Sequence, residues 1–173
     1  MFKRSTAAFC CAALMCASVP AAADAAPAHF WQCAPFARML SGIQLFGNAA
    51  TWWKQAIGKY ARGSAPKEGS VLVFKAIGSM RAGHVATVSQ VISDRIIKVT
   101  HANWSTPGKV EHDVEVMDVS ARNDWSKVRV WFKGIHDLGT REYPAYGFIY
   151  DHKPGADAAT TASADDQDGK AKG

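Results

Sequence analysis

Residues 83–100 read GHVATVSQVISDRIIKVT, and this stretch decides the fold that the sequence predicts. Two runs rich in β-branched residues, Gly83 to Ile92 and Arg95 to Thr100, are separated only by Ser93 and Asp94. A short polar link between two such runs is typical of a tight antiparallel hairpin. We therefore expect two neighbouring strands, the second of which continues through His101 to Trp104.

Further short β-rich runs accompany this hairpin, and a helical pattern precedes them. We expect additional strands at residues 70–74, 110–117, 128–132 and 148–150. Apolar residues recur at helical spacing from Cys33 to Phe46, with Gly47 as the stop, and a second helix is expected from Ala49 to Tyr60. Helices followed by a run of strands indicate an α+β fold, with N-terminal helices packed on an antiparallel β-sheet.

The two ends of the chain differ in composition from the middle. Residues 1–23 have a basic start (Lys3, Arg4), an apolar core and an Ala-x-Ala site, which is the pattern of a cleavable signal peptide. The apolar run is too short for a comfortable membrane span, although a retained anchor or a lipid tether is the alternative. Residues 153–173 lack aromatic and large aliphatic residues and are expected to be a disordered tail. Residues 24–152 are then one catalytic domain.

The charge of the chain narrows the class of partner. Lys and Arg total 20 against 15 Asp and Glu, which gives +5, or +3 once Lys3 and Arg4 leave with the signal. No Lys/Arg run is long enough to indicate nucleic-acid binding. A mildly basic protein exported to the periplasm or the extracellular space suits a polyanionic cell wall, although the charge could equally serve solubility alone. We expect a monomer.

Cys33 is the only cysteine outside the expected signal peptide. An unpaired thiol in an oxidising compartment can be over-oxidised or can cross-link two chains, so its presence indicates a chemical role, usually nucleophilic attack. The start of the first expected helix is also a place where the helix dipole lowers a thiol pKa. The alternative is a cysteine that only packs in the core.

A thiol nucleophile needs a base, and the base needs an orienting group. His84 opens a strand after Gly83, which makes it the candidate base. His101 and Asn103 are the candidate orienting groups, because alternate residues of a strand share a face and the hairpin sets that face beside His84. Gln32 and Trp104 flank this site and are the expected substrate-binding residues.

A zinc site formed by Cys33, His84 and His101 is the alternative chemistry. The sequence contains no C-x-x-C, no H-E-x-x-H and no closely spaced histidine pair, so we expect neither a metal nor an organic cofactor.

The segments around these residues resemble the CHAP domain, the cysteine, histidine-dependent amidohydrolase/peptidase module of the NlpC/P60 superfamily. The resemblance rests on five stretches. They are Gln32-Cys33 with Phe36-Ala37-Arg38, Gly47-Asn48-Ala49 with Trp52, Pro66 to Phe74, Gly83-His84-Val85-Ala86, and His101-Ala102-Asn103-Trp104.

The resemblance implies a papain-like fold and hydrolysis of amide bonds, usually in peptidoglycan. It assigns the nucleophile to Cys33 and the general base to His84. The third position departs from the commonest CHAP pattern, Glu-x-Asn, because this chain has His101-x-Asn103. A neutral imidazole stabilises an imidazolium less than a carboxylate does, so either His101 or Asn103 orients His84.

These observations predict an exported cysteine amidohydrolase or endopeptidase that cleaves peptidoglycan through a thioester intermediate. The alternative is a weakly active or inactive module that binds the cell wall with the same groove. A toxin-like hydrolase with an immunity partner is a third possibility, which the sequence neither favours nor excludes.

Overall fold

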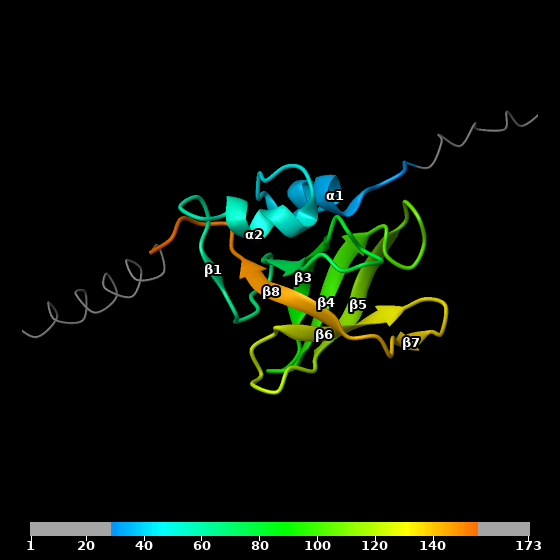
Figure 1. The fold of residues 1–173 in the computed structure, drawn as a ribbon. Helices are drawn as coiled ribbons and strands as arrows, with labels where there is room; N and C mark the ends of the chain where they lie inside the picture. The colour runs from blue at the N-terminus through cyan, green and yellow to red at the C-terminus, as the bar shows by residue number, and fades with distance from the viewer. Residues whose placement is uncertain (1–28, 156–173) are drawn as a thin grey trace, which may run out of the picture.

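A computed structural model describes residues 29–155 of the chain. The expected signal peptide, residues 1–23, lies outside these residues, as does the expected tail from residue 156 onward. Two short helices lie against one side of a strongly curved β-sheet (Figure 1). Within residues 29–155 no helix is long and apolar enough to cross a membrane.

Within the described residues the sheet has eight strands in the order β1-β8-β2-β3-β4-β5-β6-β7, and every pairing is antiparallel. An additional pairing of β8 with β6 closes the sheet into a barrel. The strands are β1 (Arg62–Gly63), β2 (Val71–Phe74), β3 (His84–Val91), β4 (Ile96–Ala102), β5 (Val110–Asp118), β6 (Lys127–Phe132), β7 (Asp137–Leu138) and β8 (Tyr143–Ile149).

Two hydrophobic clusters use the two faces of the same strands. On β2, Leu72 and Phe74 belong to the cluster inside the barrel, whereas Val71 and Val73 belong to the cluster that also contains the helices. The alternation follows from the two-residue period of a strand, and all four residues are fully buried. The helices are thereby fixed on the outer face of β2, β3 and β8, which confirms the expected packing of N-terminal helices on an antiparallel sheet. A papain-like relationship remains a prediction.

The first helix, α1 (Cys33–Ser41), is shorter than the sequence predicts. It ends at Gly42, which adopts a left-handed φ of 78° and donates its N–H to the Arg38 carbonyl over 3.1 Å. Glycine takes this conformation without the steric cost of a Cβ, so it closes the helix. Ile43 and Leu45 are still buried, but they reach the core from an irregular segment. The predicted end at Phe46 is therefore wrong.

The second expected helix, residues 49–60, is also wrong in length. A 3-10 turn, η1 (Ala49–Thr51), leads into α2 (Trp52–Gln55), and turns follow to Tyr60. Trp52 and Ala56 are buried as their spacing predicts, whereas Ile57 is 59% exposed. The short helix is held mainly by Trp52, which packs into the cluster under the helices.

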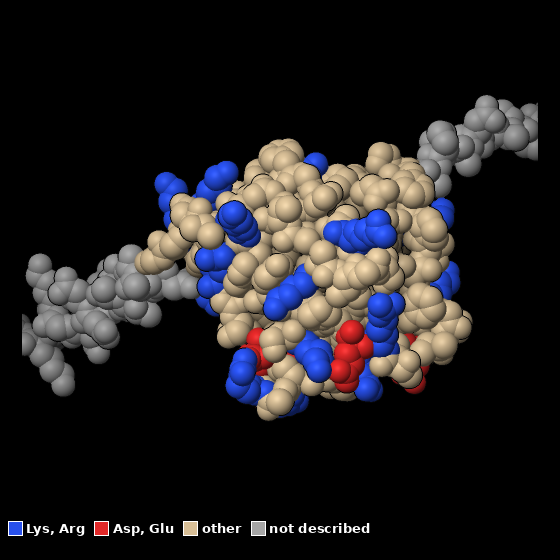
Figure 2. All heavy atoms as spheres, viewed as in Figure 1, with Lys and Arg blue, Asp and Glu red and all other residues tan. Residues whose placement is uncertain are grey.

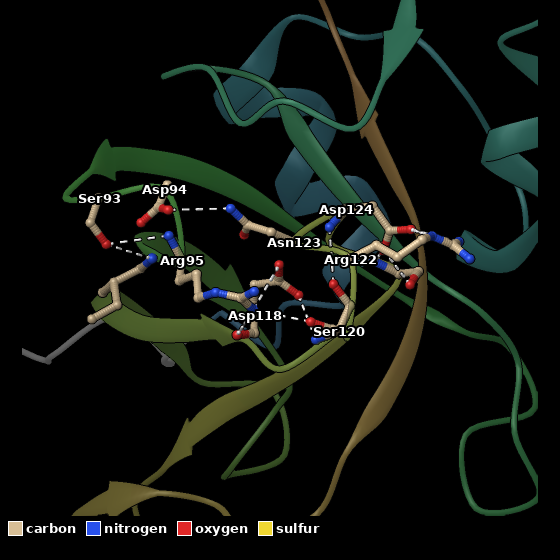
Figure 3. Close-up of polar contacts among 10 residues, drawn as sticks. Ser93, Asp94, Arg95, Asp118, Ser120, Arg122, Asn123 and Asp124 are labelled. Atoms are coloured by element: carbon tan, nitrogen blue, oxygen red, sulfur yellow. Dashed lines mark hydrogen bonds and ion pairs between the residues drawn. The ribbon is translucent and has the colours of Figure 1, made fainter.

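One end of the barrel is tied by polar contacts between two loops (Figure 3). Arg95, beside the β3–β4 turn, donates to the Ser120 carbonyl over 3.0 Å, and the Ser120 N–H donates to Asp118 over 2.8 Å. Asn123 donates to Asp94 of the same turn over 3.3 Å. These bonds fix the turn of the hairpin, while His84 begins β3 and His101 lies near the end of β4, at the opposite end.

Candidate active site

Cys33 is the first residue of α1, and its position follows from the backbone around it. Gln32 is extended, with ψ 152°, and its carbonyl accepts the Phe36 N–H over 3.2 Å, which starts the helix at Cys33. Pro35 in the first turn has no N–H to leave unpaired. The side chain of Cys33 is half-buried, and it packs against the cluster under the helices.

A cleft of about 450 Å³ brings the predicted site residues together. Its walls come from the start of α1, the loop that precedes β3, the segment after β4, and the ends of β6 and β8. The lining residues are Gln32, Cys33, Ser79, Met80, Arg81, Ala82, Gly83, His84, Asn103, Trp104, Phe132 and Tyr143. The thiol of Cys33 and the imidazole of His84, far apart in the sequence, therefore face one cleft.

Gly83 sets the position of His84. Its φ is 69°, and a Cβ at this residue would lie 2.6 Å from the backbone nitrogen of Ala50. The Ala50 N–H donates to the Ala82 carbonyl over 2.9 Å, so η1 is bonded to the backbone just ahead of β3. Only glycine permits both the conformation and the contact.

His84 and His101 form a buried pair. Nε2 of His84 and Nδ1 of His101 are hydrogen-bonded at 3.0 Å, and the two residues are only 3% and 1% exposed. Because Nε2 of His84 is engaged, Nδ1 is the ring nitrogen that remains to accept a proton.

The side chain of Asn103 is hydrogen-bonded to Gln32 and Gly108 and not to His84. β4 ends at Ala102, and Asn103 has a left-handed φ of 62°, so the alternation that would put it on the face of His101 stops one residue too early. Its Nδ2 donates to Oε1 of Gln32 over 2.9 Å, and its Oδ1 accepts the Gly108 N–H over 2.8 Å. Of the two candidate orienting groups, the structure places His101 on His84 and Asn103 on Gln32.

Glu111 is a member of this cluster that the sequence reasoning missed. It lies opposite His101 in the β4–β5 register, and its Oε2 is 3.4 Å from Nε2 of His101. The available signal was the strand expected from Val110 to Met117, which would pair with the strand that carries His101. Without the register, nothing distinguished Glu111 from the other acidic residues of that strand.

Aromatic rings cover the imidazole pair. The ring centroid of Trp104 lies 4.8 Å from that of His84 and 5.7 Å from that of His101, and the Phe74 centroid lies 5.5 Å from that of His84. Trp104 also lines the cleft, where the sequence predicts that it binds substrate. The rings keep water away from the pair and lower the dielectric constant around it.

Burial controls the protonation of both histidines. It lowers the pKa of His84 well below the ordinary value of 6.5, and charge repulsion from His101 adds to this effect. Burial also lowers the pKa of His101, while the contact with Glu111 opposes the shift. His84 is therefore neutral at pH 7 and able to accept a proton.

The pKa of Cys33 is raised above its ordinary value of 9.0, because burial disfavours the thiolate. The backbone N–H groups of Val85, Ala34 and Cys33 itself oppose this shift without overcoming it. The position at the helix start predicts a lowered pKa for the Cys33 thiol, and that prediction is wrong. The cleft is therefore lined by a thiol and an imidazole that are both neutral near pH 7.

Cys33, His84 and His101 do not form a metal-binding cluster here. Among residues 29–155, no group of three or more His, Cys, Asp or Glu side chains is arranged to hold a metal ion.

A half-buried thiol at a helix start lines one cleft with a buried histidine, and a second histidine is hydrogen-bonded to that histidine. Cysteine-dependent hydrolases use these residue types. The family model of the CHAP domain matches residues 24–103, and this part of the chain is consistent with a CHAP domain, for which the NlpC/P60 superfamily is the general family context. No curated protein matches the chain.

CHAP domains are generally hydrolytic amidase or peptidase domains, and their substrate is peptidoglycan. The match ends at Asn103, shortly after β4, so it includes Cys33, His84 and His101. Strands β5 to β8, which complete the barrel and carry Glu111, lie beyond the matched residues.

Proposed function

We propose that this protein is an exported cysteine amidase or endopeptidase that hydrolyses amide bonds of peptidoglycan stem peptides. The observation that carries the proposal is the shared cleft of Cys33 and His84, with Nε2 of His84 engaged by His101. The CHAP match supports the substrate class.

The reaction begins with proton transfer from the Cys33 thiol to Nδ1 of His84 as the sulfur attacks the carbonyl carbon. The tetrahedral intermediate collapses with cleavage of the C–N bond, and His84 gives its proton to the leaving amine. Water then attacks the thioester while His84 removes a proton from it. Cleavage of the C–S bond releases the carboxylic acid and restores the thiol.

The oxyanion of each tetrahedral intermediate needs donors near Cys33. The Cys33 N–H is one, because the first N–H groups of a helix have no intrahelical acceptor. The second is Nε2 of Gln32. Asn103 engages Oε1 of Gln32, which leaves the amide nitrogen of that side chain as the end available to the cleft. In this account Asn103 contributes by holding Gln32.

The presence of Arg81 in the cleft favours a substrate that carries a carboxylate. With His84 neutral, Arg81 is the charged side chain among the residues that line the cleft. It has no hydrogen bond, ion pair or ring contact with any residue in the described part of the chain. An arginine without an internal partner is suited to bidentate binding of a carboxylate, and stem peptides carry free carboxylates beside their amide bonds.

The surface charge suits an anionic polymer. In the view of Figure 2, Lys and Arg side chains are spread over the whole face, and the Asp and Glu side chains seen there lie near its lower edge. Such a face favours approach to a cell wall outside the cytoplasm, where the expected signal peptide would send the protein. We propose that the protein acts there as a monomer, without a metal or an organic cofactor.

A weakly active or inactive wall-binding module is the second candidate. The observation that favours it is the raised pKa of Cys33, which leaves little thiolate at neutral pH. Such a module would bind through the same cleft and leave the polymer intact.

The test is incubation of purified sacculi with the wild-type protein and with Cys33→Ala, followed by mass spectrometry of the muropeptides. The proposal expects new peptide fragments with a free amine and a free carboxylate from wild type only, and their masses identify the bond cleaved. Binding of both proteins to sacculi with no new fragments would establish the wall-binding module instead.

A further inference from the structure

Nε2 of His101 is a buried nitrogen with no hydrogen-bond partner of ordinary geometry among the described residues. The nearest acceptor is Oε2 of Glu111 at 3.4 Å, within the range of an ion pair. The Glu111 side chain is only 9% exposed, and its Oε2 also accepts the Ser105 N–H over 3.0 Å. A carboxylate buried at this depth is seldom without a role, and this one faces the back of the histidine pair.

We propose that Glu111 is a positioning residue for the hydrolytic reaction, acting on His84 through His101. This inference rests on the proposed function, because it assigns a further residue to the same site. The carboxylate touches neither the substrate nor the thiol. Its effect is on which ring nitrogens carry protons.

The contact of Glu111 with His101 and the contact of His101 with His84 together determine the tautomers of both histidines. An ionised carboxylate only accepts hydrogen bonds, so Nε2 of His101 must carry the proton that faces Glu111. Nδ1 of the neutral His101 ring is then an acceptor, and Nε2 of His84 must carry the proton that it accepts over 3.0 Å. Nδ1 of His84 is left unprotonated, which is the form that can remove the proton from Cys33.

The same carboxylate stabilises the charge that appears during the reaction. When the Cys33 proton moves to His84, the buried pair acquires a positive charge that water cannot reach. Burial alone would raise the pKa of Glu111, but the contacts with His101 and Ser105 outweigh burial and lower it, so Glu111 supplies a negative charge one ring away. The other ionisable groups that line the cleft beside the pair are Cys33 from α1, Arg81 in the cleft wall and Tyr143 of β8, and no Asp or Glu is among the lining residues.

The decisive variant is Glu111→Gln. Glutamine keeps the shape of the side chain, but its amide can donate a hydrogen bond as well as accept one. An amide can donate to Nε2 of His101, which reverses both tautomers and leaves Nδ1 of His84 protonated. A carboxylate-to-amide change next to the histidine of a Ser-His-Asp triad lowers kcat by about 10⁴-fold through the wrong tautomer. Glu111 is separated from His84 by the imidazole of His101, so its effect on the rate should be smaller. We expect a loss of about 10- to 100-fold in kcat, with KM changed less than about twofold.

Two further variants separate positioning from folding. Glu111→Asp keeps the charge and should retain the wild-type tautomers and most of the rate. Glu115→Gln removes another carboxylate from β5, at the position opposite Lys98 in the β4–β5 register and away from the cleft, and should change nothing. The kcat and KM of all three variants are measured on a soluble stem-peptide substrate. Tautomers and pKa values of both histidines come from ¹⁵N NMR of the imidazoles.

The inference is supported if Glu111→Gln lowers kcat, lowers the pKa of His101 and reverses the tautomers while Glu115→Gln does none of these. Unchanged tautomers with an unchanged kcat overturn it, and so does an equal loss of rate in Glu111→Asp with wild-type tautomers. If the wild-type protein cleaves no peptidoglycan amide, the proposed function fails, and the NMR comparison still decides whether Glu111 sets the tautomers. If Glu111→Gln does not fold, Glu111→Asp and the wild-type NMR spectra decide.

Discussion

Nε2 of His84 and Nδ1 of His101 lie 3.0 Å apart in the interior of the protein, on neighbouring strands of one hairpin. This contact leaves a single nitrogen of His84 for the cleft and holds the ring that carries it. Because the rings are buried under Trp104 and Phe74, both stay neutral near pH 7. At rest His84 is therefore a neutral proton acceptor and Cys33 a neutral thiol. They do not form a thiolate–imidazolium pair.

The reactivity of Cys33 toward iodoacetamide should follow the pKa of the thiol. A thiol with a lowered pKa would be alkylated fast below neutral pH, whereas the buried environment raises the pKa of Cys33 above its ordinary value of 9.0. Since only the thiolate reacts, we expect the rate to be slow at about pH 6 and to rise roughly tenfold per pH unit toward about pH 9. Mass spectrometry of the alkylated peptide provides the rate. A plateau already reached below pH 7 would show an activated thiolate and contradict the buried neutral pair.

The histidine pair should make the protein less stable as the pH falls. The folded pKa values of His84 and His101 are below 6.5, so in acid the unfolded chain binds protons that the folded chain does not. Stability is fully present above about pH 6.5 and declines below it, by about 1.4 kcal/mol per pH unit for each imidazole that stays neutral in the fold. Melting temperatures between about pH 7.5 and pH 5 test this expectation.

His112, which is exposed, provides the matched control for that series. His112→Gln should leave the slope of melting temperature against pH unchanged, and His84→Gln should reduce it. Equal slopes in wild type and His84→Gln would mean that His84 does not resist protonation.

The general fold could be predicted because the strands carry strong local signals. The hairpin of β3 and β4 was predicted almost to the residue, since its apolar runs are bounded by Gly83 and by the Ser93-Asp94 turn. β8 was predicted only at its last residues, because Pro144 and Gly147 interrupt its pattern. Its pairing with β2 and β6 stabilises it where local propensity does not, and that information is not local in the sequence.

The candidate site divides in the same way. Cys33, His84, Gln32 and Trp104 lie on one cleft, as local patterns and the family resemblance suggested. The choice between His101 and Asn103 depended on where β4 ends, and helix and strand ends are the least certain part of a sequence-based prediction. Glu111 and the direction of the Cys33 pKa depend on register and burial, which a single sequence does not display.

Arg81 should determine how well the enzyme uses substrates with a carboxylate next to the scissile amide. Arg81→Gln is expected to raise KM for such a stem peptide about tenfold or more, because one charge-assisted bidentate contact is lost. The same peptide with that carboxylate amidated should be cleaved by wild type and variant at similar kcat/KM.

Arg122→Gln serves as the control for Arg81, since Arg122 is exposed and bonded to Asp124 away from the cleft. It should behave as wild type with both peptides. An equal loss of kcat/KM on both peptides in Arg81→Gln would show that Arg81 does not bind the carboxylate.

Gly83→Ala should destabilise the protein more than the same substitution at another glycine with a similar backbone conformation. A Cβ at Gly83 meets the backbone of Ala50, whereas Gly69 has a similar φ of 79° with nothing within 4 Å. We expect Gly69→Ala to cost about 1 kcal/mol of unfolding free energy from backbone strain alone, and Gly83→Ala roughly 2–4 kcal/mol. Urea denaturation compares them. Equal losses would indicate that η1 moves freely away from β3.

The most direct test of the central claim is the rate at which Cys33→Ser cleaves purified sacculi, compared with wild type at equal concentration. Serine nearly keeps the shape of the side chain, but its hydroxyl is a weaker acid and a poorer nucleophile than the thiol. Wall hydrolysis should therefore fall to background, with a melting temperature close to that of wild type. Cleavage by Cys33→Ser at a rate near that of wild type would show that the sulfur is not the attacking atom.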